Sequence, residues 1–453
     1  MESFKFVVLA VAVFGLLAVT PMSRAGAPAA YGIASRVPPK AYLNMPSSAH
    51  GRIPALLSQT GVFTDVRAMT PAAGLIPYDL IVPFWSDGAA KVRYLALPKG
   101  QKIGFTPDGD WTFPAGTVFV KTFELPTDEA KPQIKRRLET RLIVRDGKGG
   151  VYGVDYKWRP DNSDADLLTS SLVENVAIRR RDGSTREQPW YYPSRENCIT
   201  CHNAHTSGTL GLKTRQLNRS FTYPSGISDN ELRTFNHLHL LDTSLSDAQL
   251  QALPKLAALS DTSLSIEDRA RSYLDANCGH CHRPGGTVAY FDARYSTPLA
   301  KQELIDGPIL INEGIDRPHV IAPHDIWRSI AYMRINTNGD IRMPPLARET
   351  IDAQGVQVLR DWINSMPGKD VLAPPKIAPD GGTFGKAVTV RITSPDPGAQ
   401  IRYTEDGSVP GPQDMLYSSP ISVSGPTVVR ARTYKDGMTR SITAESVFII
   451  GQQ

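Results

Sequence analysis

The four cysteines of this 453-residue chain form two Cys-x-x-Cys pairs. A histidine directly follows each pair, although the chain has only nine histidines in all. With this spacing two cysteine sulfurs can form thioether bonds to the vinyl groups of one haem, while the adjacent imidazole binds the iron as its proximal ligand. The sequence therefore predicts two covalently attached haems c, bound through Cys198, Cys201, Cys278 and Cys281, with His202 and His282 as iron ligands.

Two other roles for these cysteines stay open. The four thiolates could hold a structural zinc ion, although such a site would not require the two histidines. In an oxidising compartment the cysteines could also close two short-range disulfides. The repeated Cys-x-x-Cys-His pattern favours haem over both.

The second motif lies between two stretches with helical spacing of apolar residues. Residues 265–277 run into the motif with Ser265 as a suitable N-cap, and residues 352–365 follow it, ending before Pro367-Gly368. Helix, haem motif, long loop, Met-Pro and helix follow one another in the order of a single-haem cytochrome c. We therefore expect a mostly α cytochrome c region here.

The long loop of this region contains Met343, which two prolines follow. A thioether is a soft ligand that suits haem iron, and Met/His ligation raises the reduction potential. Met343 is therefore the predicted distal ligand of the second haem. Met333 competes for this role, but its apolar helical surroundings favour a place in the core.

The distal ligand of the first haem is less defined, because no Met-Pro loop follows His202. His237, in a stretch of helical character, is the favoured candidate. The alternatives are an open five-coordinate iron or one of His205, His239, Met45 and Met69. His205 is only three residues from His202 and cannot easily reach the opposite haem face.

Composition and the N-terminus indicate an exported protein. The net charge of +5 is small for this length and does not indicate nucleic-acid binding. Lys5 precedes an apolar run over residues 6–19, and small residues follow, so residues 1–25 are expected to be a secretory signal peptide with cleavage after Ala25. An uncleaved anchor or cleavage after Ala27 are the alternatives. The expected location is periplasmic or extracellular, with no transmembrane segment in the mature chain.

The length exceeds what one hydrophobic core supports, about 250–300 residues. We expect a multidomain fold: a β-rich N-terminal domain over 26–185, a first haem region over 186–259, a second haem, cytochrome c-like domain over 260–370, and a small C-terminal β-sandwich over 371–453. Alternating strands around residues 94–97, 117–120 and 142–144 and Asp-Gly turns support the β-rich part. No catalytic cluster stands out.

Segments outside the Cys-x-x-Cys-His motifs resemble known protein families as well. Residues from about Tyr42 to Pro367 resemble a family of bacterial diheme c-type cytochromes through 74–79, 84–89, 190–195, 211–218 and 343–345. The tail resembles the chitobiase/β-hexosaminidase C-terminal type of β-sandwich through 401–404 and 406–408. These resemblances imply haem binding and electron transfer, and they supply no substrate.

The expected function is electron transfer, as a carrier or as the partner of an exported dehydrogenase, rather than catalysis. The expected partner is thus another redox protein. A diheme peroxidase-like enzyme is the first alternative, because one of its haems would be open to substrate. The second alternative is a redox protein that contacts a surface or glycan through its tail.

Overall fold

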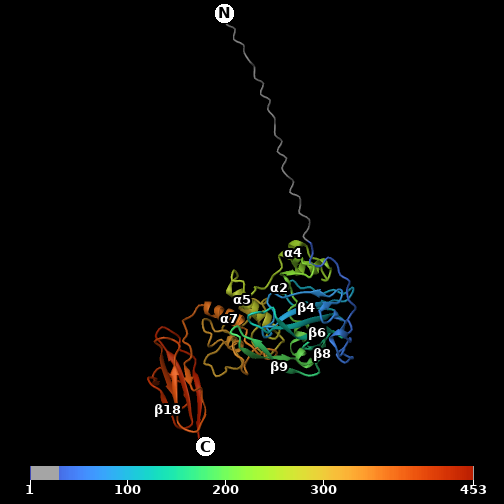
Figure 1. Cartoon of the computed structure of the whole chain (residues 1–453). Helices are drawn as coiled ribbons and strands as arrows, with labels where there is room; N and C mark the ends of the chain where they lie inside the picture. Colours follow the sequence, from blue (N-terminus) through green and yellow to red (C-terminus); the bar gives the residue numbers. More distant parts are fainter. Residues whose placement is uncertain (2–29, 452–453) are drawn as a thin grey trace.

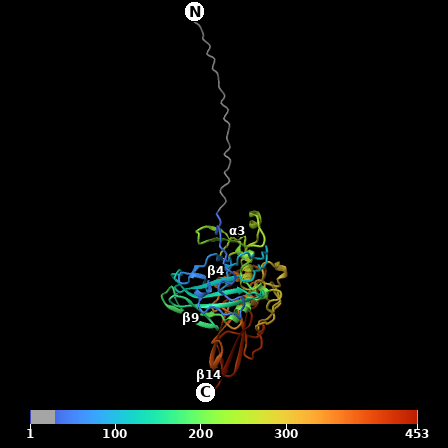
Figure 2. The same ribbon diagram turned by 90° about the vertical axis from the view of Figure 1, so that its right-hand side faces the viewer.

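The structure is a computed structural model that describes Met1 and residues 30–451. The predicted signal peptide therefore lies, apart from Met1, outside the described residues. Two views show a β-rich body flanked by short helices and loops, with a β-module at the end remote from α3 and α4 (Figures 1 and 2). None of the helices in the described part of the chain has the length and apolar character needed to cross a bilayer.

A six-stranded antiparallel sheet forms the centre of the N-terminal part. Its strands lie side by side in chain order: β3 (Ile76–Pro77), β4 (Ala90–Ala96), β5 (Val118–Pro126), β6 (Lys135–Arg145), β7 (Val151–Trp158) and β8 (Ala165–Leu167). At the turn between β6 and β7, Asp146 accepts hydrogen bonds from the backbone N–H groups of Lys148 and Gly150. The predicted strands and this Asp-Gly turn are confirmed.

The two faces of this sheet differ in chemistry. One face is covered by the segment before β3 and buries aliphatic side chains, among them Val118, Val120, Leu142 and Val144. Successive side chains of a strand point to opposite faces. On its other face β5 therefore carries Phe119, Lys121 and Phe123, a pattern in which a charged residue interrupts the apolar ones.

Smaller elements complete this part. β9 (Leu172–Arg179) and β10 (Thr185–Tyr192) form an antiparallel hairpin, and its Trp190 and Tyr192 pack with Phe123 in one buried cluster. The remaining elements are η1 (Leu57–Thr60), β1 (Phe63–Asp65), β2 (Thr70–Pro71), η2 (Ala204–Thr206), β11 (Ser220–Thr222), β12 (Ser228–Asn230) and η3 (Leu299–Lys301).

The expectation of a mostly α cytochrome c region is wrong. Within 186–370 the helices are α1 (Arg195–Cys201), α2 (Thr214–Leu217), α3 (Glu231–His237), α4 (Asp247–Gln251), α5 (Ile266–Asn277), α6 (Ile330–Ile335) and α7 (Ala353–Ser365). Long loops separate the last three helices. The physical reason is that these connections are rich in residues that interrupt helices, such as Pro284-Gly285-Gly286 and Pro344-Pro345.

The two predicted helices that frame the second motif are nevertheless present. Ser265 caps α5 by accepting a hydrogen bond from the N–H of Asp268, and Asp352 caps α7 through the N–H of Gly355. A Cβ at Gly355 would lie 2.2 Å from the ring of Tyr273. The glycine therefore allows α7 to approach α5 closely.

The C-terminal module consists of two sheets. The first contains β13 (Lys376–Ala378), β15 (Val388–Thr393) and β18 (Ile421–Val423). The second contains β14 (Gly382–Phe384), β20 (Ala444–Ile450), β19 (Thr427–Tyr434), β16 (Gln400–Thr404) and β17 (Met415–Leu416). Val390 and Ile392 of the first sheet and Val429 and Phe448 of the second share one buried core. The β-rich character of the tail is confirmed.

An ionic cluster joins this module to the loop before α6. Asp316 of that loop lies 3.3 Å from the guanidinium of Arg328, 3.1 Å from that of Arg432 and 3.4 Å from that of Arg440. The side chains of Arg328 and Arg432 are each only 6% exposed. Because Arg432 and Arg440 belong to the tail, Asp316 links the tail to the second haem region.

We expect Asp316→Ala to loosen the tail, because it leaves nearly buried guanidinium groups without this carboxylate. Asp316 keeps some solvent contact, so the cost should be below the ~3–5 kcal/mol of a fully buried pair. Thermal unfolding and limited proteolysis near residue 373 measure the effect. Glu445→Ala is the control, because its pair with Arg430 is exposed and worth about 0–1 kcal/mol. Equal behaviour of both variants would contradict the linking role.

Candidate haem-binding site

Helix α1 carries the first Cys-x-x-Cys-His motif. Its first turn is fixed by a capping box, in which Ser194 accepts from the N–H of Asn197 and Asn197 accepts from the N–H of Ser194. The hydroxyl of Tyr191, in β10, also donates to Asn197 over 2.7 Å. The β9–β10 hairpin thereby sets the direction in which α1 presents its cysteines.

Helix α1 lies directly on the sheet. A Cβ at Gly153 of β7 would lie only 2.4 Å from the Cβ of Cys198, so any larger residue would push the helix away. Cys198 is 7% exposed and belongs to the cluster that contains Phe119 and Ile143. The first cysteine of the motif is therefore held by strand residues remote in sequence.

His202 has the environment of an iron ligand. Its Nδ1 lies 3.1 Å from the carbonyl oxygen of Gly208 and can donate to it, which leaves Nε2 with its lone pair. Burial, assisted by the charge of Lys121, lowers the pKa of His202 to about 3. The imidazole is therefore neutral at physiological pH, as iron ligation requires.

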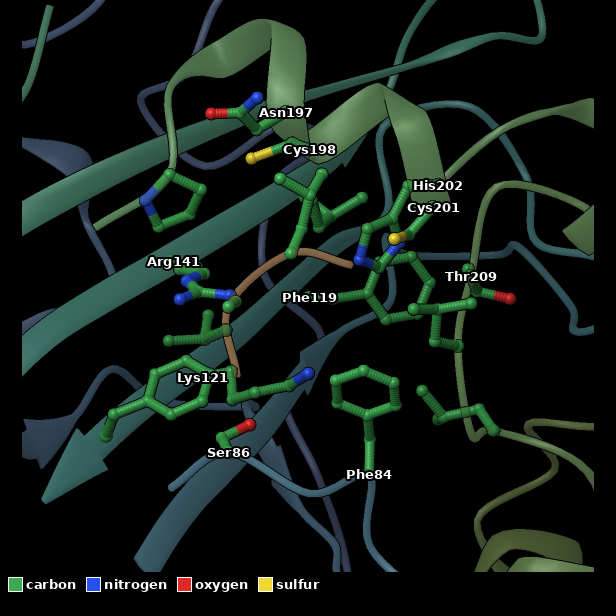
Figure 3. A pocket seen from close by; sticks show the side chains of 18 of the residues that line it. Phe84, Ser86, Phe119, Lys121, Arg141, Asn197, Cys198, Cys201, His202 and Thr209 are labelled. Atoms are coloured by element: carbon green, nitrogen blue, oxygen red, sulfur yellow. The ribbon is translucent and has the colours of Figure 1, made fainter. Parts of the chain in front are cut away.

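A cleft opens between α1 and the sheet. Its empty space, including the open mouth, is about 930 Å³. Phe119, Ile143 and Leu212 give it apolar walls, and Cys198, Cys201 and His202 lie along one side. Lys121 and Arg141 extend from the sheet toward the same space (Figure 3).

Basic side chains cross the sheet beneath the cleft. Arg93, Lys121 and Arg141 are direct cross-strand neighbours on β4, β5 and β6. Arg93 forms an ion pair with Asp79, and Arg141 forms one with Glu139. These cations can receive the negative charges of a bound ligand.

A second, more polar cleft of about 670 Å³ adjoins the first. The two share Phe84, Lys121, Thr209, Leu210 and Leu212 as lining residues. His280 of the second motif borders this second cleft. Basic residues outnumber acidic ones in its lining: the acidic residue is Asp110, and the basic residues are Lys91, Arg93, Lys121, Lys213, Arg283 and Arg294.

The second motif begins at the end of α5, where the N–H of Cys278 bonds to the carbonyl of Leu274. His282 stacks on Phe291 with ring centroids 4.3 Å apart, and burial lowers its pKa to about 4. The Nδ1 of His282 is buried and has no hydrogen-bond partner among the described residues. The ring is thus neutral and keeps a lone pair for a metal.

The two motifs meet in space. Cys201 and Cys281 lie near enough to interact, and this interaction, with one involving His280, lowers the pKa of Cys281. The same interaction and burial raise the pKa of Cys201. All four cysteines are free, so the two disulfides considered above are not formed. Within residues 30–451 no group of three or more His, Cys, Asp or Glu side chains is arranged to hold a metal ion.

The segment at residues 84–87 fastens the second motif to the first. The N–H of Trp85 donates to the side chain of Asn277, the last residue of α5, over 2.8 Å. Asp87 accepts from the N–H groups of Glu349 and Thr350, just after the Met-Pro loop. This one segment therefore positions both the second motif and the loop that carries Met343.

Met343 is linked to the second motif through Arg334. Its N–H bonds to the carbonyl of Arg334 over 2.9 Å, and the charge of Arg334 is near enough to help lower the pKa of His282. Met333, its competitor, packs against buried clusters on both sides of α6. This placement is compatible with Met343 as a ligand and with Met333 as a core residue.

The candidates for the distal ligand of the first haem do not reach its cleft. His237 stacks on Tyr31 at 3.5 Å, and its Nε2 bonds to the carbonyl of Ala34. Met45 and Met69 belong to the core on the opposite face of the sheet. His205 and His239 are exposed. His237, the favoured candidate, is thus occupied by Tyr31 and Ala34.

The residues around the first cleft fit a covalently attached haem c. Cys198 and Cys201 would form the thioether bonds, and His202 would bind the iron. The apolar walls would enclose the macrocycle, while Arg141 could receive a propionate. At the second motif the same donor set is present, with the unpartnered Nδ1 of His282 as the supporting observation.

Reasoning from the sequence missed Lys121, Arg141 and Gly153. The signal for Lys121 was its place between Phe119 and Phe123, where period-two alternation puts it on a face that is otherwise apolar. No such signal marks Gly153, because its partner Cys198 lies on a distant helix.

Comparison with known proteins supports only the predicted family resemblance of the tail. A family model described as chitobiase/beta-hexosaminidase C-terminal domain matches residues 379–445. No curated protein and no solved structure matches the chain. The resemblance of residues 42–367 to diheme c-type cytochromes has no support from these comparisons and stays a prediction.

Met343→Ala should abolish the far-red charge-transfer band of a methionine-ligated ferric haem and lower the potential of one haem, because it removes the thioether. Absorption spectra and redox titration measure both. Met333→Ala is the matched control and should leave band and potential unchanged. If the band instead survives in Met343→Ala and disappears in Met333→Ala, the ligand is Met333.

Proposed function

We propose that this chain is an exported diheme c-type cytochrome that transfers electrons, as a soluble carrier or as the partner of an exported dehydrogenase. The observation that carries this proposal is the proximity of Cys201 and Cys281, which are near enough for each to shift the pKa of the other. It brings together two Cys-x-x-Cys-His motifs that lie in different parts of the sequence.

The haems, when bound, would accept and release single electrons. The chain would hold the two attachment sites against one another and shield them from water. His202 and His282, both neutral, would bind the irons, and Met343 would bind the second iron from its other side. Phe84 lines both clefts and contacts His280, with ring centroids 5.3 Å apart, so it fills the space between the sites.

The buried cations would influence the reduction potential of the first site. A positive charge in a low-dielectric surrounding favours the state that carries an additional electron. Arg141, which lines the first cleft, is such a charge on the sheet. It would therefore raise the potential of a haem bound in the first cleft.

Two observations favour further candidate functions. The open cleft beside His202 would suit a diheme peroxidase-like enzyme, in which one iron is accessible to substrate. The family match of the tail supports a contact with a surface or glycan, while the ionic cluster at Asp316 keeps the tail fixed to the redox part. Both are compatible with a location outside the cytoplasm.

The exported protein should retain two haems after denaturing electrophoresis, because thioether bonds survive unfolding. Haem staining and the mass of the intact chain measure this. Replacing Cys198 and Cys201 together by alanine should leave one haem, and the same change at Cys278 and Cys281 is the matched variant. A mass equal to that of the polypeptide alone would refute the proposal.

Hydrogen peroxide should react only slowly and without turnover, while a small soluble redox carrier should exchange electrons quickly. Stopped-flow mixing of the fully and half-reduced protein distinguishes these outcomes. Met343→Ala is the comparison, because an opened iron shows how fast an accessible haem of this chain reacts. Rapid reoxidation with turnover in the unaltered protein would replace the carrier by a peroxidase.

A further inference from the structure

Lys121 differs from the other basic residues on the charged face of the sheet. Lys91 donates to the carbonyl of Phe84, Arg93 pairs with Asp79, and Arg141 pairs with Glu139. Lys121 makes no hydrogen bond or ion pair with any residue of the described chain. The nearest recorded contact of its Nζ is the ring of Phe123, 5.7 Å from the ring centroid.

The neighbours of Lys121 disfavour its charged form. Arg93 and Arg141 lie directly opposite it on the two adjacent strands, and like charges in such positions repel. Burial and these two guanidinium groups lower the pKa of Lys121 to about 7. The surroundings of Lys121 therefore favour its neutral form, which carries a lone pair.

The amine is directed into the cleft that His202 borders. Figure 3 shows the side chain of Lys121 extended into the space that His202 and Cys201 face, with Phe84 beside it. Arginine offers no lone pair, and the amide oxygen of Asn197 already accepts hydrogen bonds from Tyr191 and Ser194. Among the described residues that line this cleft, Lys121 supplies the amine, and the histidines and methionines considered from the sequence do not reach it.

We propose that Lys121 is the distal ligand of the first haem, binding its iron through Nζ opposite His202. This inference rests on the proposed haem binding. In forming the bond, the ammonium gives its proton to solvent and the nitrogen lone pair is donated to the iron, with no change in oxidation state. The protein would then supply two nitrogen ligands to the first iron, from His202 and Lys121, and one nitrogen and one sulfur ligand to the second, from His282 and Met343.

The test is the ferric spectrum of the haem-loaded full chain with Lys121→Ala and Lys121→Arg. Both variants should convert one of the two haems from low spin to high spin in electron paramagnetic resonance, because arginine keeps the charge but cannot bind iron. Added methylamine should restore low spin in Lys121→Ala. Lys131→Ala, an exposed lysine, is the control and should change nothing.

Several outcomes would overturn this assignment. A low-spin first haem in both variants would mean that another residue binds the iron. Low spin retained in Lys121→Arg but lost in Lys121→Ala would assign Lys121 to a charge contact with a propionate. If neither variant folds, near-infrared magnetic circular dichroism of the unaltered protein still decides, since a high-spin first haem there also contradicts the proposal. A chain without any haem would refute the proposed function itself.

Discussion

The charged face of the six-stranded sheet is the constraint on which the rest of the structure depends. Arg93, Lys121 and Arg141 stand in one row across three strands, and Glu139 and Asp155 lie beside them in the interior. Charges in such a place are costly unless they are paired or meet a bound group. Burial, together with Glu139, raises the pKa of Asp155. Apolar clusters cover this face only in part, and α1 with the first Cys-x-x-Cys-His motif lies over the remainder.

The second motif reaches the same place through a small number of specific contacts. Trp85 and Asp87 bind the end of α5 and the segment after the Met-Pro loop, although these partners are some 190 to 260 residues further along the chain. The loop also contributes Leu346 and Ala347 to the wall of the first cleft. The segments that carry the two Cys-x-x-Cys-His motifs are therefore joined to one another through the sheet rather than packed as two independent units.

This arrangement has a consequence for redox chemistry. If haems bind as proposed, the proximity of Cys201 and Cys281 would provide a short path for electrons, and the cations beneath the first site would favour the reduced state there. A lysine ligand on the first iron and a methionine ligand on the second would give the two centres different potentials. The tail, fixed through Asp316 to the loop before α6, adds a surface without separating from the redox part.

The sequence by itself determined the local features of this protein. The Cys-x-x-Cys-His motifs, the strands around residues 94–97, 117–120 and 142–144, the two capped helices at residues 266–277 and 353–365 and the β-rich tail all follow from short-range spacing and capping. Only the tertiary structure decided that the central part is mostly loops, that Cys201 meets Cys281, and that Lys121 rather than His237 faces the first cleft. The physical reason is that these outcomes depend on cross-strand neighbours and on side-chain contacts between residues far apart in the chain, which periodicity along the sequence does not encode.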